Sequence, residues 1–410
     1  MKNFVLLLTF MFGGQVSFTQ NSSCNNTQRY RNTVDFPNIN TTTAIQFGSG
    51  TTVGGVFQNL LMDIYQPVGD TASSRPLIIL AFGGGFVSGN RQNMLDLCQY
   101  YTKRGYVTAS IDYRLYDIFA TPDSTMMGEV VIRAINDMKA AIRFFREDAA
   151  TNNIYKIDSN FIFVGGESAG AIIANHTAYM DSTDALEPFI LNAINNNGGY
   201  LGNSSSNTQY STKVAGVLNF SGSLRSAAYI DANNPALFSA HDDQDGDVPY
   251  GGGYSNIIPL YTQGSKLMHD TAISNNIHSE LITIPNSTGH ISYFNTTVWK
   301  DSVLNSSTQF MRDIICSITT STTNIQEQKI STITFPNPSF GDMTIQLSDV
   351  PCEYNVAVFD ATGRLVHQAN NLADQEINLN GQQFAKGMYF VSIQFHDSKV
   401  RPIQQKIIFR

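Results

Sequence analysis

Basic side chains are scarce in this sequence, and their scarcity argues against one class of partner. The chain of 410 residues has 25 Lys and Arg against 33 Asp and Glu, a formal net charge of -8. Proteins that bind nucleic acid need a concentrated basic face to neutralise phosphates. No cluster of Lys and Arg occurs along the chain, so we expect no nucleic-acid partner.

Cysteines are also few, and their spacing argues against a metal site. The four cysteines form no CxxC pair; they are Cys24, Cys98, Cys316 and Cys352. Cys98 has apolar neighbours spaced along one helix face, which is typical of a buried thiol. The sequence allows a disulfide of Cys24 with Cys316 or with Cys98 and does not choose between them.

Long apolar runs are absent after the first residues. The start of the chain has one Lys, an apolar run from Phe4 to Phe12, and then small and polar residues. The run is too short to cross a bilayer and has the pattern of a secretory signal peptide. We therefore predict a signal peptide over residues 1–20 and an exported chain without a transmembrane segment.

The next part of the chain, residues 21–316, alternates apolar strands with helical stretches. Strands are expected at 61–65, 77–82, 106–113, 161–165, 214–220, 236–241 and 281–284. Apolar residues at three- and four-residue steps predict an amphipathic helix over 126–148. Nearly all-apolar strands separated by helices indicate an α/β fold with a mostly parallel sheet, whose ligands bind beyond the carboxyl ends of the strands.

Three other segments differ in character. The long polar connection over 181–212 is either a lid or binding loop or a disordered excursion. The Ser- and Thr-rich residues 317–330 read as a linker. Residues 331–410 contain short alternating strands broken by Asn, Gly and Pro turns, which predicts a small C-terminal all-β sandwich domain.

The segment GESAG provides a candidate nucleophile. Gly166, Ser168 and Gly170 fit the pattern G-x-S-x-G between a predicted strand and a predicted helix. In a nucleophile elbow the serine lies on a strained strand-to-helix turn, where flanking side chains would clash. We therefore predict that Ser168 is catalytic.

A serine hydroxyl needs a base that is itself oriented by an acid, and here both are expected after later strands. His290 follows the last predicted strand and is the candidate base. Within the segment HDDQDGD, Asp245 is the candidate acid, and Asp243 and Asp247 are rivals. A calcium loop or a solvated turn is the alternative reading of this cluster. The other nearby histidines are expected to be packing or surface residues: His176, His269 and His278.

Three consecutive glycines, Gly83 to Gly85, follow the second predicted strand. They either supply the geometry of a tight turn or offer bare N–H groups to an anion. Attack by Ser168 on an ester would create such an anion at the same edge of the sheet. We therefore expect these glycines to offer N–H groups to an oxyanion, with a further N–H from Ala169, the residue after the nucleophile.

The motifs FGGGF, DYRL, GESAG, HDDQD followed by VP, and TGH resemble the carboxylesterases of the α/β-hydrolase superfamily. The resemblance spans roughly residues 60–313 and implies a Ser168–Asp245–His290 triad without a cofactor. It also implies that the oxyanion donors are Gly84, Gly85 and Ala169. Two departures stand out. Many relatives have His where this chain has Phe82, so the hydrogen bonds behind the glycines must differ. Asp242 and Asp243 replace the usual Gly and Thr.

The C-terminal segments FPNP, VFDATGRLV and KGMYFVSI resemble the sorting domain recognised by the type IX secretion system of Bacteroidetes. This resemblance implies passage through the outer membrane by that machinery, followed by release or attachment at the cell surface. A carbohydrate-binding sandwich is the alternative.

Together these observations predict a secreted serine esterase that acts on a small-molecule or polysaccharide-linked carboxylic ester. Aromatic residues are candidates to line an acyl or aryl pocket: Phe86, Tyr200, Tyr250, Tyr254 and Tyr293. Asp112 and Arg114 are expected to form a supporting ion pair. The alternatives are a serine peptidase of the same fold, or a noncatalytic binding module of the cholinesterase-like fold.

Overall fold

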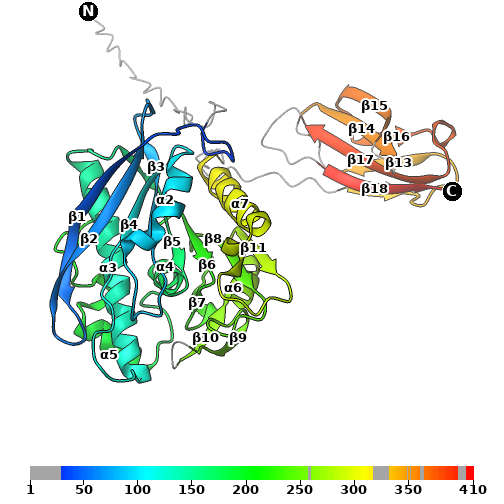
Figure 1. The fold of residues 1–410 in the computed structure, drawn as a ribbon. Helices are drawn as coiled ribbons and strands as arrows, with labels where there is room; N and C mark the ends of the chain where they lie inside the picture. The colour runs from blue at the N-terminus through cyan, green and yellow to red at the C-terminus, as the bar shows by residue number, and fades with distance from the viewer. Residues whose placement is uncertain are drawn as a thin grey trace, which may run out of the picture. The chain divides into compact units, whose positions relative to one another are not determined.

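The computed structural model describes residues 29–256, 260–316, 332–348, 350, 352–360, 364–395 and 403–410. The predicted signal peptide and linker lie outside these residues. The chain divides between residues 318 and 319 into two compact units (Figure 1).

The first unit is built on an eight-stranded sheet with the order β1-β2-β4-β3-β5-β6-β8-β11. The six strands from β4 to β11 are parallel, and β2 runs antiparallel to both of its neighbours. The bounds are β1 Ile39–Thr51, β2 Phe57–Pro67, β3 Arg75–Ala81, β4 Val107–Ile111, β5 Ile157–Glu167, β6 Gly216–Phe220, β8 Ala236–Asp242 and β11 Ser279–Ile284. The predicted mostly parallel sheet is confirmed.

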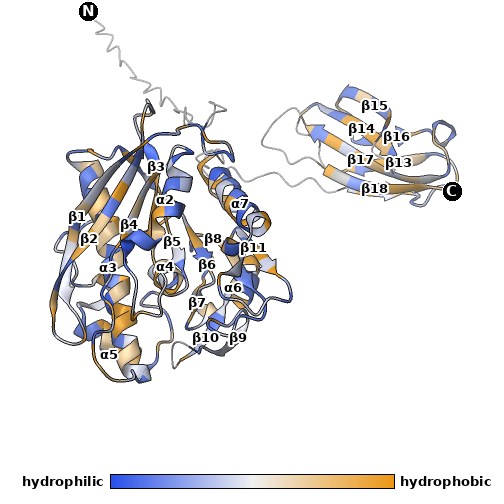
Figure 2. Cartoon of the chain, viewed as in Figure 1, coloured by the Kyte–Doolittle hydropathy of each residue, from blue (hydrophilic) through white to orange (hydrophobic). Residues whose placement is uncertain are grey.

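Helices cover both faces of this sheet. In β8, Phe238 packs against Phe310 of α7 on one face. The next residue, Ser239, points to the other face and bonds Asn219, which in turn reaches α4 and α6. This arrangement explains why every residue of β3, β4 and β6 is buried. Figure 2 shows hydrophobic stretches in both the strands and the helices of this unit. The helices are α2 Leu95–Thr102, α3 Ser124–Ala150, α4 Ala169–Tyr179, α5 Pro188–Asn196, α6 Ser265–Ser274 and α7 Thr297–Cys316.

The long connection between α4 and β6 is fastened to α3, which speaks against a freely disordered excursion. Four α3 side chains, spaced three or four residues apart, donate hydrogen bonds to its backbone carbonyls. The pairs are Asn136 with Asn197, Lys139 with Tyr200, Arg143 with Tyr210 and Arg146 with Lys213. This segment contains α5, and a small sheet of β7 Ser223–Leu224, β10 Tyr261–Gly264 and β9 Gly252–Tyr254 lies further along the chain.

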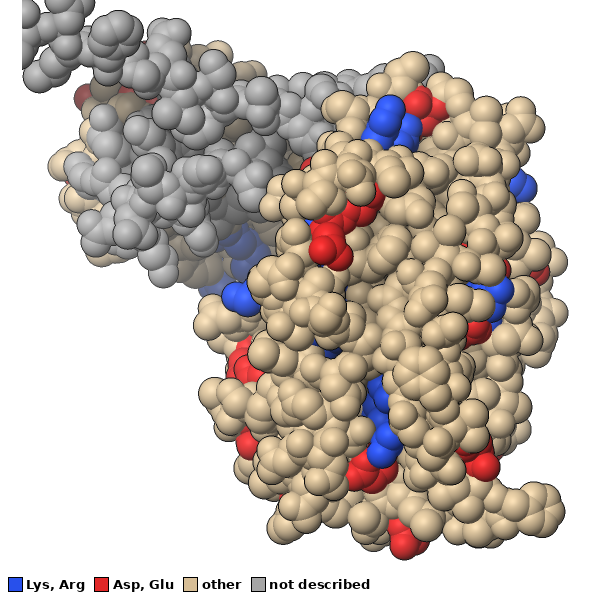
Figure 3. Space-filling view, turned by 90° about the vertical axis from the view of Figure 1, so that its left-hand side faces the viewer, with Lys and Arg blue, Asp and Glu red and all other residues tan. Residues whose placement is uncertain are grey.

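Charged residues on the face of the first unit shown in Figure 3 are dispersed. Lys and Arg occur there among Asp, Glu and uncharged side chains and do not gather into one basic patch. Within the described residues, no helix is long and apolar enough to cross a membrane.

The second unit contains two antiparallel sheets with the orders β12-β13-β16 and β15-β14-β17-β18. Alternate residues of these strands point inward and form a separate apolar core that includes Ile345, Val356 and Val391. The predicted all-β sandwich is confirmed. Its strands are β12 Thr332–Phe335, β13 Met343–Leu347, β14 Tyr354–Asp360, β15 Leu365–Leu372, β16 Glu376–Leu379, β17 Gly387–Phe395 and β18 Ile403–Phe409.

The cysteines resolve one of the two pairings that the sequence left open. Cys98 is a fully buried free thiol in α2, and burial raises its pKa to about 12. The alternative disulfide between Cys24 and Cys98 is therefore wrong. Cys316, the last residue of α7, is disulfide-bonded, and Cys24 lies outside the described residues.

Candidate active site

Ser168 lies on a sharp turn between β5 and α4, and its backbone has φ 51° and ψ -115°. A Cβ at Gly166 would lie 2.2 Å from the carbonyl oxygen of Ala81, and one at Gly170 only 2.0 Å from it. Both flanking positions therefore require glycine, because the turn passes directly against β3. The Ser168 N–H donates to the Phe220 carbonyl at 2.9 Å, which ties the turn to β6 as well.

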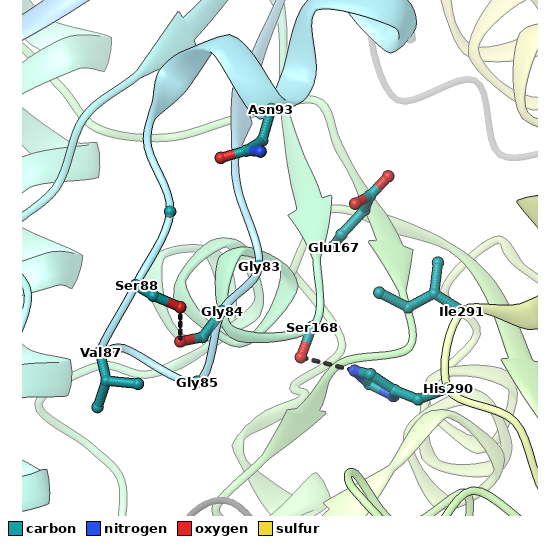
Figure 4. Close-up of a pocket in the computed structure, with 11 residues that line it drawn as sticks. Gly83, Gly84, Gly85, Val87, Ser88, Asn93, Glu167, Ser168, His290 and Ile291 are labelled. Carbon is teal, nitrogen blue, oxygen red and sulfur yellow. Dashed lines mark hydrogen bonds between the residues drawn. The ribbon is translucent and has the colours of Figure 1, made fainter.

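Three predicted residues meet at the carboxyl ends of the strands. The Ser168 hydroxyl lies 2.7 Å from Nε2 of His290 (Figure 4). Nδ1 of His290 lies 2.7 Å from Oδ2 of Asp245. Ser168 follows β5, Asp245 follows β8 and His290 follows β11. The parallel order of these strands thus places residues that are more than 120 positions apart in one hydrogen-bonded chain.

Backbone donors hold Asp245 in place. Its Oδ1 accepts hydrogen bonds from the N–H groups of Asp247 and Val248, at 2.9 and 3.0 Å. Burial alone would raise the pKa of Asp245, but hydrogen bonds from His241 and His290 outweigh it and lower the pKa to about 2. The carboxylate therefore stays ionised, and of the three candidate aspartates Asp245 is the one that contacts His290.

His241 is a contact of Asp245 that the sequence did not point to. It is fully buried, and its Nε2 lies 3.3 Å from Oδ2 of Asp245 and 2.9 Å from the Val248 carbonyl. The Val248 carbonyl and the Asp245 carboxylate can only accept, so Nε2 is the nitrogen that carries the proton, and the Ser265 hydroxyl lies 2.7 Å from Nδ1. His241 is also the first residue of the segment HDDQD, which was the only available signal.

Asp242, and also Asp243, which was a rival candidate for the acid, bind the loop that carries His290. The Asp242 carboxylate accepts hydrogen bonds from the Ser287 hydroxyl and from both the hydroxyl and the N–H of Ser292. Oδ1 of Asp243 accepts from the Ser287 N–H at 3.0 Å. The segment HDDQD therefore holds both the candidate acid Asp245 and the loop that carries His290. Its carboxylates bind different partners and do not converge on one point.

The glycine loop, residues 83–90, forms the wall opposite His290 (Figure 4). Gly84 and Gly85 have φ values of 118° and 61°, which favour glycine. A Cβ at Gly84 would lie 2.1 Å from the Ser88 carbonyl oxygen. Within the described residues, the N–H groups of Gly84 and Gly85 donate no hydrogen bond. Ala169, the third expected donor, is the first residue of α4.

The ion pair expected between Asp112 and Arg114 is wrong. Asp112 binds Arg91 at 2.6 Å, and Arg91 also binds Asp63 of β2 at 2.8 Å. Arg114 instead pairs with the buried Asp137 of α3 at 2.6 Å. The chain leaves β4 at Ile111, so the two side chains no longer share a face as they would in a strand.

Ser168 and His290 line an open cavity of about 540 Å³. The glycine loop and Asn93 form one side, and Glu167 and Ile291 form the other. None of the five aromatic residues expected in a pocket lines it. Phe86 and Tyr293 are fully buried in the core, and Tyr254 is exposed against Tyr261. No residue of the segment 181–212, for which a lid or binding loop was one of the two readings, lines this cavity.

Glu167 is a further residue at the cavity that sequence reasoning missed. Its carboxylate has no hydrogen-bond partner within the described part of the chain. Burial raises its pKa to about 7, although His290 opposes the rise. Its position beside Ser168 in GESAG was the available signal.

The remaining candidates do not join the site. His176 bonds the Ile172 carbonyl and accepts from the Arg225 N–H, and burial lowers its pKa to about 4. His269 bonds Ser279, and His278 lies near Glu280. Among the described residues, no group of three or more His, Cys, Asp or Glu is placed to hold a metal ion.

Comparison with known proteins gives two family matches. Residues 62–225 match the BD-FAE family, and residues 333–410 match the secretion system C-terminal sorting domain. The search of curated proteins found no match.

Among solved structures, the chain is similar to esterase 2 of the planctomycete Thermogutta terrifontis. The propionate-bound form has 20% identity and a TM-score of 0.48, covering 66% of this chain and 93% of that one. The form phosphorylated by paraoxon has 20% identity and a TM-score of 0.49, covering 67% and 94%.

The first unit is thus an α/β-hydrolase domain of the esterase class, a carboxylic ester hydrolase. More particularly, it contains a BD-FAE domain, and the second unit is a type IX C-terminal sorting domain, which directs the protein to the cell surface or the exterior.

Proposed function

We propose that the protein is a secreted serine carboxylesterase that works through an acyl-enzyme. The observation that carries the proposal is the hydrogen-bonded chain from Ser168 through His290 to Asp245 at the base of an open cavity. This arrangement suits acyl transfer, since each group lies within reach of the proton that it must accept or orient.

In the proposed reaction the Ser168 oxygen attacks the ester carbonyl carbon while its proton passes to Nε2 of His290. Asp245 orients the ring through Nδ1 and stabilises the imidazolium. The N–H groups of Gly84, Gly85 and Ala169 stabilise the negative charge on the former carbonyl oxygen. His290 then protonates the leaving alkoxide.

A water molecule completes the cycle. His290 removes a proton from water, the resulting hydroxide attacks the acyl carbon, and Ser168 leaves with the proton that His290 returns. The products are a carboxylic acid and an alcohol, and no cofactor takes part.

The proposal is tested by hydrolysis of p-nitrophenyl acetate, butyrate and octanoate by the exported chain. Ser168→Ala should abolish turnover and labelling by a fluorophosphonate, whereas Ser307→Ala, a buried serine of α7, should keep both. A folded chain that is neither active nor labelled would favour a noncatalytic binding module. Labelling combined with hydrolysis of peptides but not esters would favour a serine peptidase.

A further inference from the structure

The glycine loop has a support that the triad does not explain. The segment Asp112 to Tyr116 follows β4. It makes hydrogen bonds with the residue just before the loop, with a residue in the middle of the loop and with the residue just after it. Tyr113 Oη donates to the Phe82 carbonyl at 2.9 Å. The Tyr116 N–H donates to the Phe86 carbonyl at 2.8 Å. Asp112 accepts from the Arg91 N–H at 3.0 Å.

The first of these contacts lies at Phe82, the residue that directly precedes the three glycines. The Phe82 ring stacks on the Tyr113 ring, with 4.2 Å between centroids and 21° between planes, and both side chains are buried. Near its end, the glycine loop packs on the Phe82 ring, since a Cβ at Gly89 would lie 2.4 Å from Cδ2 of Phe82. A phenyl ring makes no hydrogen bond of this kind, so the polar contact at this position is the one between the Phe82 carbonyl and the Tyr113 hydroxyl.

The Phe82 carbonyl also lies close to the turn that carries Ser168. A Cβ at Gly170 would approach this oxygen to 2.7 Å. The carbonyl is thus held between the Tyr113 hydroxyl and the first turn of α4, two residues before Gly84. Burial raises the pKa of Tyr113, so the hydroxyl keeps its proton and acts as a donor.

We infer that Tyr113 is a positioning residue for the oxyanion hole. Its hydroxyl fixes the Phe82 carbonyl and thereby the direction in which the Gly84 and Gly85 N–H groups point. This inference rests on the proposed esterase function. Donors aimed at the developing oxyanion act in the transition state more than in substrate binding, so their misalignment lowers kcat rather than raising KM.

The variant Tyr113→Phe removes one hydroxyl and keeps the stacked ring. Tyr101→Phe is the matched control, because Tyr101 is equally buried and its hydroxyl bonds Ser307 of α7 at 2.8 Å. For p-nitrophenyl butyrate we expect Tyr113→Phe to lower kcat by about tenfold or more and to leave KM within about twofold. Tyr101→Phe should keep the wild-type kcat.

A second measurement separates positioning from a general loss of stability. Butylboronic acid forms a tetrahedral adduct with an active serine, in which one oxygen occupies the oxyanion position. Its inhibition constant should rise in Tyr113→Phe by a factor similar to the fall in kcat. An unchanged kcat, an equal loss in Tyr101→Phe, or a change confined to KM would overturn the inference. A wild-type chain without esterase activity would instead defeat the proposed function, and this role with it.

Discussion

The Ser292 N–H donates a hydrogen bond to Oδ2 of Asp242 at 3.0 Å, so the end of β8 holds the loop that carries His290. Asp242 is completely buried, and within the described residues its carboxylate accepts hydrogen bonds from the Ser287 hydroxyl and from the hydroxyl and N–H of Ser292. Because Asp245 follows three residues later, one short segment sets the positions of both the acid and the base.

This relationship predicts a kinetic effect of Ser292→Ala. The variant removes one hydroxyl donor to Asp242 and keeps the backbone bond, so His290 should remain near Ser168 but be held less firmly. We expect kcat to fall by about three- to tenfold, because small displacements of a catalytic base are costly. Steady-state kinetics beside Ser307→Ala would check this, and equal rates in the two variants would contradict it.

The pKa of Asp245 predicts how stability changes in acid. Its folded-state pKa of about 2 lies below the ordinary value of 3.8, so the carboxylate stabilises the folded chain above pH 3.8. That contribution is lost as the pH falls toward 2, and we expect it to be about 1–2 kcal/mol. Urea unfolding at pH 5 and pH 3 should show a larger loss for the wild type than for Asp245→Asn.

The exposed Asp301 provides the control for this comparison, since Asp301→Asn should lose as much stability as the wild type over the same pH range. If Asp245→Asn lost as much stability as Asp301→Asn, the pKa of Asp245 would not be lowered in the folded chain, and the prediction would be wrong.

The sequence predicted the fold and the proposed catalytic residues because both depend on local patterns. A buried parallel strand is a continuous apolar run, and the glycines of GESAG are required by the backbone of the elbow. The candidate nucleophile, acid and base could then be predicted from their order in the chain and from their positions just after predicted strands. β1 was missed because Phe47 is its only buried residue, so it has no apolar run.

Other features depend on contacts between distant residues and could not be predicted. Arg91, rather than Arg114, pairs with Asp112 because of where η1 (Arg91–Met94) lies in space. The prediction that five aromatic residues line a pocket was wrong for a similar reason. Aromatic side chains such as those of Phe86 and Tyr293 are typical of pocket walls, but they are equally typical of a hydrophobic core, where both of these residues are buried.

The raised pKa of Glu167 predicts that stability changes with pH in the opposite direction to the change predicted for Asp245. Burial raises its pKa from 4.5 to about 7, so the folded chain keeps a proton that the unfolded chain loses over this range. Stability should therefore fall as the pH rises from 4.5 to 7, by about 1–3 kcal/mol for this group. Glu167→Gln should remove that fall, as measured by urea unfolding at pH 4.5 and pH 8. Glu280→Gln, at a more exposed site, should behave like the wild type.

The elbow glycines provide the last prediction. In Gly170→Ala the new Cβ, which is fixed directly to the backbone, would lie 2.0 Å from the backbone carbonyl oxygen of Ala81. Neither can rotate away, so α4 and β3 must separate and carry Ser168 away from His290. We expect a loss of about 1–3 kcal/mol or more in the free energy of unfolding, and a fall in kcat of at least about tenfold.

Gly251→Ala is the matched control for Gly170→Ala, because a Cβ at Gly251 meets nothing within 4 Å and its φ is not in the left-handed region. Thermal unfolding and p-nitrophenyl butyrate hydrolysis should leave this control at the wild-type values. Activity of Gly170→Ala close to that of Gly251→Ala would mean that the first turn of α4 can shift without moving Ser168. The close approach of β3 would then not be what requires glycine after the nucleophile.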